Sequence, residues 1–62
     1  MVTKVIDVSN VQAGDVVVIT NETYVCDYVE KDAIAYDMQL HDNVGNKVRK
    51  TFCAGEPIQI AI

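Results

Sequence analysis

The stretch AYDMQLHDNVGNKVRKTF, residues Ala35–Phe52, predicts a β-hairpin and decides the fold class of this chain. Apolar and polar residues alternate over positions 36–41, as they do in a strand with one buried and one solvent-exposed face. The alternation resumes over 47–52, and the intervening segment 43–46 supplies Asn and Gly residues, which tolerate the positive φ of a hairpin turn. Only Lys50 breaks the pattern, because it falls on the face expected to be buried. Either a local bulge turns it outward, or it is a basic contact point on an acidic domain.

The rest of the chain predicts further short strands joined by turns. Residues 2–8 form a short, imperfect strand or an extended arm, which pairs either within the chain or with another chain. A continuous β-branched run at 16–19 is typical of a strand covered on both faces. Residues 23–29 and 58–62 alternate as strands do, and turn-forming residues separate these segments. No segment has a sustained helical period.

Five short strands of this kind predict a small antiparallel barrel or sandwich. A barrel is favoured, because closure removes the sheet edges and joins all inward faces into one core. We expect a single domain over 1–62, with 1–10 as its N-terminal strand or arm. Strand alternation places Tyr24, Cys26 and Tyr28 on one face, although which face points inward is open. The expected core comprises Val16, Val18, Tyr24 or Val25, Met38, Leu40, Val48, Phe52, Ile58 and Ile60.

Size and composition set further expectations. The chain has 62 residues, half of them hydrophobic. A domain of this size buries only roughly 60% of the surface of its unfolded chain, so dimerisation or a partner would help its stability. No apolar run approaches the roughly 18 residues of a membrane helix, and the first residues lack the features of a signal peptide. We therefore expect a cytoplasmic protein that uses no membrane, with Cys26 and Cys53 as reduced thiols.

The distribution of charge is more informative than its total. The formal net charge of −4 argues against generic attraction to nucleic acid or to an anionic membrane, because neutralising phosphates requires clustered Lys and Arg. Acidic residues dominate up to Asp42, whereas the segment from Asn43 onward contains Lys47, Arg49 and Lys50 against a single acid. The chain is thus acidic over two thirds of its length and mildly basic on one strand. Exposed cross-strand ion pairs would explain this pattern without any functional role.

The sequence offers little catalytic chemistry. His41 is the only histidine, and no spacing pairs it with Cys26 or Cys53 and a third orienting group, as a catalytic triad requires. The same three residues would supply three zinc ligands, but no Cys-x-x-Cys motif or second histidine supports a closed site. Both cysteines are expected as small buried hydrophobic residues, and His41 as an outward-pointing strand residue. We therefore predict no enzymatic activity, no metal and no cofactor.

The succession of turns and strands resembles a known family. It is similar to the N-terminal SH3-like (KOW-type) domain of bacterial elongation factor P and of its archaeal and eukaryotic counterparts. The resemblance extends over nearly the whole chain and depends on the order and spacing of its motifs more than on any one of them. The segments that carry it are Ala13–Ile19, Tyr24–Val25, Leu40–Asp42, Gly45–Val48 and Lys50–Phe52. It implies a small five-stranded antiparallel SH3-like barrel.

The same resemblance draws attention to the loop before the hairpin. The family carries there a Gly-rich loop with a lysine, often modified, that reaches toward the ribosomal peptidyl-transferase centre. Here this place is taken by Val29–Ile34, and Lys31 aligns with that lysine by position. The segment is shorter, contains no glycine and flanks Lys31 with acidic residues. The resemblance therefore implies the fold and does not transfer the translation role.

Two functional hypotheses from different classes follow. The first is a small non-catalytic binding module that contacts a protein partner, or a second copy of itself. Its contact surface would be acidic and would present Tyr24 or Tyr28, because tyrosine brings a large contact area and a polar tip. The neighbouring acids are Asp27, Glu30 and Asp32. A variant of this hypothesis has the acidic surface occupy a basic site on a host protein, as small proteins encoded by phages or mobile elements do.

The second hypothesis is an RNA- or ribosome-associated domain. It would use Lys47, Arg49 and Lys50 to contact phosphates and would stack bases on Tyr36 or Phe52. The net acidity favours the first hypothesis over the second. Binding that weakens with added salt would instead favour the second.

Overall fold

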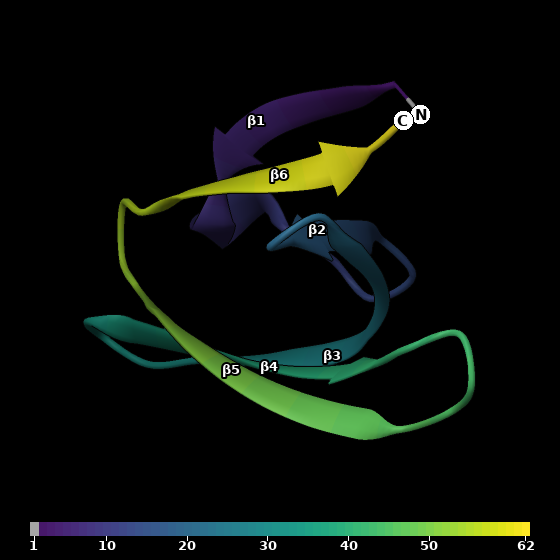
Figure 1. Cartoon of the computed structure of the whole chain (residues 1–62). Helices are drawn as coiled ribbons and strands as arrows, with labels where there is room; N and C mark the ends of the chain where they lie inside the picture. Colours follow the sequence, from purple (N-terminus) through teal and green to yellow (C-terminus); the bar gives the residue numbers. More distant parts are fainter. Residues whose placement is uncertain (1) are drawn as a thin grey trace.

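In the computed structural model, which describes residues 2–62, the chain forms one antiparallel sheet with the strand order β1-β6-β2-β3-β4-β5. Figure 1 shows the sheet curling so that β1 and β6 lie over β3, β4 and β5. The predicted all-β antiparallel fold is confirmed. The elements are β1 (Thr3–Asp7), the 3-10 helix η1 (Val8–Asn10), β2 (Val16–Ile19), β3 (Glu22–Lys31), β4 (Ala35–His41), β5 (Lys47–Cys53) and β6 (Pro57–Ala61).

The sheet has six strands rather than the five expected, because the N-terminal segment is a strand within it. β1 pairs antiparallel with β6, from Thr3 opposite Ala61 to Asp7 opposite Pro57. This pairing answers whether the segment pairs within the chain or with another one. Among the described residues no strand pairing joins β1 to β5, so the sheet is not closed. Closure into an SH3-like barrel stays a prediction.

The hairpin of β4 and β5 forms as predicted, and its turn is fixed by one carboxylate. Asp42 Oδ1 accepts hydrogen bonds from the backbone amides of Val44 at 3.0 Å and Asn46 at 2.8 Å, and Gly45 has a φ of +91°. Burial acts to raise the pKa of the Asp42 carboxyl, but the hydrogen bonds, led by that from the Asn46 amide, outweigh it and hold the pKa below its ordinary value. The turn therefore sets the register of the hairpin.

Lys50 lies on the inner face, by which we mean the face that carries the buried side chains of the sheet. The register between β4 and β5 is continuous and places Lys50 directly opposite Met38, so the explanation by a local bulge is wrong. Lys50 is nevertheless exposed, because β5 is the last strand of the sheet. An inward-pointing charge on an edge strand is a recognised device against edge-to-edge aggregation.

A bulge does occur in β3, where the sequence did not indicate one. Cys26 lies opposite Leu40 and Tyr28 opposite Gln39, so Asp27 is an extra residue without a partner. Cys26 is therefore buried on the inner face, whereas Tyr28 emerges on the opposite face, here called the outer face, and is 47% exposed. The expectation that Tyr24, Cys26 and Tyr28 share one face is wrong for Tyr28.

The core differs from the predicted one mainly in β2 and at η1. Val17 is fully buried, while Val16 and Val18 are only half-buried, so the expected phase of β2 is wrong. A run of consecutive β-branched residues has no alternation from which its inward side can be read. Val25 and Val48 are likewise only half-buried. The buried core is Val8, Val11, Val17, Cys26, Met38, Leu40, Ile58 and Ile60, with Ile6, Ile19, Tyr24, Val29, Tyr36 and Phe52 packed against it.

Candidate functional site

The outer face of β3, β4 and β5 gathers more of the predicted binding residues than any other part of the sheet. Tyr28 lies opposite Gln39, and Gln39 lies opposite Arg49, which forms a row across the three strands. Because each residue comes from the interior of a strand, the row is held by two backbone ladders. A half-exposed tyrosine on such a support offers a large contact area at little cost in conformational entropy.

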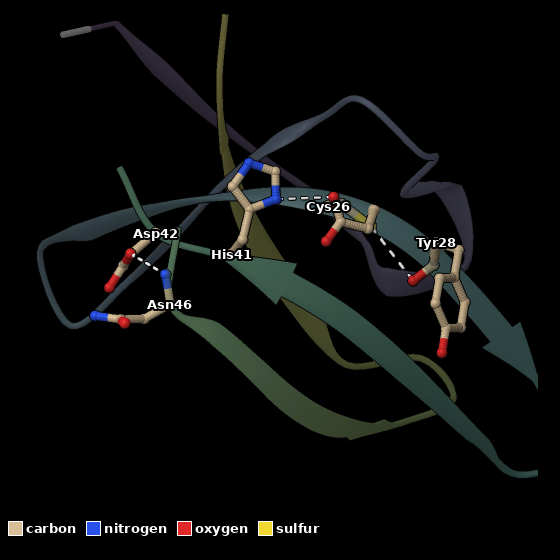
Figure 2. Close-up of polar contacts among 6 residues, drawn as sticks. Cys26, Tyr28, His41, Asp42 and Asn46 are labelled. Atoms are coloured by element: carbon tan, nitrogen blue, oxygen red, sulfur yellow. Dashed lines mark hydrogen bonds and ion pairs between the residues drawn. The ribbon is translucent and has the colours of Figure 1, made fainter. Parts of the chain in front are cut away.

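Asp27 and His41 form a polar pair at the bulge. His41 Nδ1 lies 2.8 Å from Asp27 Oδ1, and both side chains are about one third exposed. Figure 2 draws His41 with the dashed line from its ring nitrogen, together with Cys26 and Tyr28. The pair connects Asp27, the extra residue of the bulge, to β4. It thereby stabilises the bulge that places Tyr28 on the outer face.

The Cys26 thiol does not complete a catalytic group with this pair. Its Sγ atom lies 3.7 Å from the Tyr28 carbonyl oxygen on the buried side of β3. Burial, followed by the nearby charges of Asp15 and Asp27, raises the pKa of the thiol, which is the reverse of what activates a cysteine nucleophile. Within residues 2–62 no group of three or more His, Cys, Asp or Glu side chains is placed to hold a metal ion.

Arg49 belongs to an acidic network rather than to an open basic patch. Its Nη2 atom lies 3.5 Å from Asp37 Oδ2 and 4.0 Å from Glu30 Oε2. Thr51 donates a hydrogen bond of 2.6 Å from its hydroxyl to Asp37 Oδ1. All of these groups lie on the outer face of neighbouring strands, so the charge of Arg49 is largely offset by its own sheet.

The basic strand is divided between the two faces of the sheet. Lys47 and Arg49 lie on the outer face, opposite His41 and Gln39, whereas Lys50 lies on the inner face. The three cations therefore do not form one continuous surface of the kind that phosphate binding uses. The sequence alone placed them together only because they are neighbours along the chain.

Tyr24 lies on the inner face and packs against the core, away from Tyr28. Its hydroxyl donates a hydrogen bond of 3.0 Å to Glu22 Oε2. This hydrogen bond, followed by burial and the charges of Glu22 and Asp42, raises the pKa of Tyr24. The two tyrosines that the sequence offered as alternatives therefore belong to different surfaces, and only Tyr28 adjoins Asp27 and Glu30.

Lys31 is the last residue of β3 and is exposed, opposite Tyr36. The turn that follows it is short. The Asp32 backbone amide donates to the Ala35 carbonyl at 2.8 Å, and the Ala33 amide donates to Asp32 Oδ1 at 2.7 Å. β3 thus runs through residues that we expected to form a loop, and Lys31 extends from a strand end instead of a long loop.

A polar depression lies elsewhere, at the opposite end of the hairpin from Lys31. It is formed where the turn between β2 and β3 approaches the turn between β4 and β5, and Thr20 and Asn21 in the first turn have positive φ. None of the predicted binding residues lines it. The lining residues are Asn21, Glu22, Thr23, Asp42 and Asn43.

Sequence reasoning missed several residues of the outer face, and for different reasons. Pairing residue 41 with residue 47 fixes the hairpin register. That register places Asp37, Gln39 and Thr51 on the outer face, so their position could have been deduced from the sequence. The bulge at Asp27 left no signal, because the segment alternates as a regular strand does.

Searches of family models, of curated proteins and of solved structures found nothing that matches this chain. Among the described residues no helix is long and apolar enough to cross a membrane.

Proposed function

We propose that this chain is a small non-catalytic binding module that contacts a protein partner through the outer face of β3, β4 and β5. The observation that carries the proposal is the bulge at Asp27, which turns Tyr28 out of the core side and leaves it half-exposed on a rigid strand. Bulges are commonly used to re-aim a side chain, and tyrosine is enriched at the energetic centres of protein interfaces. We name Tyr28, Gln39 and Arg49 the Tyr28 row.

The charges around the Tyr28 row favour a protein over a nucleic acid. The outer face of these strands carries three acids near the row and only two cations, and one of the cations is paired with acids of its own sheet. Nucleic-acid binding depends on a net excess of cations facing the phosphates. The groups concerned are Asp27, Glu30, Asp37, Lys47 and Arg49.

The location and ancestry of the chain belong to the same proposal. We place it in the cytoplasm, a view supported by its two free cysteines, Cys26 and Cys53. We also keep the SH3-like (KOW-type) resemblance as a proposal for the origin of the fold, without a role in translation. An origin in a phage or mobile element, with a host protein as the target, is one form of this proposal.

The test removes the tyrosine side chain and compares it with a matched loss of apolar surface elsewhere. Immobilised wild-type chain should capture a protein partner that Tyr28→Ser fails to capture. Val44→Ser is the control, because Val44 is 77% exposed at the tip of the hairpin, remote from the Tyr28 row along β4 and β5. Capture should persist at about 1 M salt, where the Debye length is only about 3 Å. Equal capture by the Tyr28→Ser chain would refute the proposal.

The nucleic-acid hypothesis is tested on the same preparation. Labelled RNA and single-stranded DNA should show no salt-dependent binding to the wild-type chain in fluorescence anisotropy. A chain carrying Lys47→Glu and Arg49→Glu serves as the comparison. Binding that weakens with salt and is lost in this variant would replace the protein-binding proposal with the RNA-associated one.

A further inference from the structure

β5 presents a free edge whose backbone geometry follows from two hydrogen bonds. At one end of the hairpin the Asp42 amide donates to the Asn46 carbonyl at 3.0 Å, and at the other the Ala54 amide donates to the Ile34 carbonyl at 3.0 Å. Between them the register is continuous, and paired positions of an antiparallel ladder alternate between hydrogen-bonded and non-bonded. The even-numbered residues of β5 therefore bond to β4. The odd-numbered residues direct their N–H and C=O groups away from it.

The end of this edge is closed by the chain itself. The Cys53 amide donates to Glu56 Oε2 at 3.0 Å, and the Glu56 amide donates to the Cys53 carbonyl at 3.1 Å. No other strand among the described residues lies on this side of β5. The backbone groups left free for a partner are those of Lys47, Arg49 and Thr51.

The side chains around this edge carry positive charge on both faces. Lys47 and Arg49 lie on the outer face, and Lys50 lies on the inner face between the half-buried Val48 and Phe52. Among residues 2–62 neither Lys47 nor Lys50 takes part in an ion pair. A strand added here would meet cations at three of the six positions from 47 to 52. Of these, Arg49 already contacts Asp37 and Glu30, so Lys47 and Lys50 supply most of the attraction.

This charge pattern disfavours a second copy of β5 as the added strand. A twofold pairing of two β5 strands keeps their inner faces on the same side. Registers that align Lys47, Arg49 and Thr51 of one copy with the same residues of the other then place Lys or Arg opposite, or diagonal to, a cation of the other copy. Like charges at such positions destabilise a sheet. An acidic strand would instead place carboxylates opposite these cations, which stabilises the pairing. The edge therefore favours an acidic strand over a second copy of β5.

We propose that the free edge of β5 binds an extended acidic segment of a protein partner, which adds to the sheet as an antiparallel strand. The proposal rests on the proposed function in that the partner is a protein, but it concerns the backbone edge of β5, which shares only Arg49 with the Tyr28 row. Main-chain hydrogen bonds to Lys47, Arg49 and Thr51 hold the segment, and its side chains give specificity. Opposite Phe52 and Val48 it carries apolar residues, and opposite Lys50, Arg49 and Lys47 it carries acids.

The probe is a synthetic peptide with this pattern, containing Val-Thr-Glu-Glu-Val-Glu, in which the first Val is placed opposite Phe52. The control peptide replaces each Glu with Lys. Titration of the isotope-labelled chain should shift the backbone amide signals of β5 with the acidic peptide only. Binding should also slow hydrogen exchange at Lys47, Arg49 and Thr51. The amides of Val48 and Lys50 should already be protected in the free chain, because they bond to β4.

Proline provides the sharpest variant, because it removes one outward N–H without touching the ladder to β4. Thr51→Pro should weaken binding of the acidic peptide by about tenfold or more, since it loses a main-chain hydrogen bond and blocks the edge. Thr51→Ala is the matched control, which loses the contact to Asp37 but keeps the amide. It should change the affinity by less than about threefold.

A charge exchange keeps the test decisive if the proline variant does not fold. Lys50→Glu should reverse the preference, so that the lysine peptide binds and the acidic peptide does not. The proposal is overturned if the acidic peptide leaves the β5 amides unshifted at millimolar concentration, or if Lys50→Glu keeps the original preference. It also fails if a folded Thr51→Pro chain binds as the wild type does, or if RNA shifts these amides more strongly than the peptide. Tyr28→Ser should leave peptide binding intact, which separates this result from the test of the Tyr28 row.

Discussion

Replacing Val17 with Ala should destabilise the sheet more than the same replacement at either neighbouring valine. Val16, Val17 and Val18 are consecutive residues of β2, and only Val17 is fully buried. It lies opposite Ile60 of β6 and Tyr24 of β3, on the inner face. The three substitutions remove the same atoms from the same strand, so the difference between them measures burial alone.

The expected magnitude follows from the buried surface that is lost. Replacing a buried valine with alanine removes the equivalent of two methylene groups. At about 0.8 kcal/mol per methylene, the loss of burial costs about 1.6 kcal/mol. The cavity left behind adds about 24 cal/mol per Å³, which brings the total for Val17→Ala to about 2 to 3 kcal/mol. Val16 and Val18 are half-buried, so the loss there should be about half as large. For a chain of 62 residues the whole stability is only roughly 3 to 9 kcal/mol.

Urea unfolding followed by circular dichroism measures these differences directly. The midpoint should fall clearly for Val17→Ala and modestly for Val16→Ala and Val18→Ala, with unchanged slopes. If Val18→Ala were as damaging as Val17→Ala, or more so, the phase of β2 described above would be wrong. The inner face of β2 would then have to be assigned from Val16 and Val18, the residues of this strand in the expected core.

Further predictions concern the hairpin turn, the cysteines and the edge strand. The pKa of Asp42 is lowered in the folded chain, so its stabilising effect is complete above the unfolded value of 3.8 and is lost as the pH falls through the folded value. Asp42→Asn should therefore lower the urea midpoint at neutral pH. In acid, the midpoints of the variant and the wild type should lie closer together. Iodoacetamide should label the exposed Cys53 of the native chain rapidly and the buried Cys26 only on unfolding, as mass spectrometry of timed samples would show; equal rates would contradict the burial of Cys26. Phe52→Ala should cost less than the roughly 3–5 kcal/mol of a fully buried Phe, because Phe52 is half-buried on an edge strand, and a larger loss in urea unfolding would mean that the edge is covered in solution.

Local patterns in the sequence were sufficient for the hairpin and for the fold class. The alternation of residues 36–41 and the Asn- and Gly-containing turn specify two strands, and the carboxylate of Asp42 fixes their register through bonds within the turn itself. The same register brings Asp37 beside Thr51 and Arg49, so part of the outer face was also accessible. Interactions between residues close along the chain carry this information, which is why it can be read without a structure.

Contacts between distant segments decided the rest. The phase of β2 depends on its packing against β3 and β6, because four consecutive apolar residues fit either face equally well. The bulge at Asp27 depends on the ladder with β4, and it alone places Tyr28 on the outer face. Lys50 is exposed because β5 is the last strand of the sheet. The order of the strands is set by contacts between distant segments and cannot be read from the local pattern around Lys50. The binding residues could therefore be named from the sequence, but the surface to which each belongs is a property of the folded sheet.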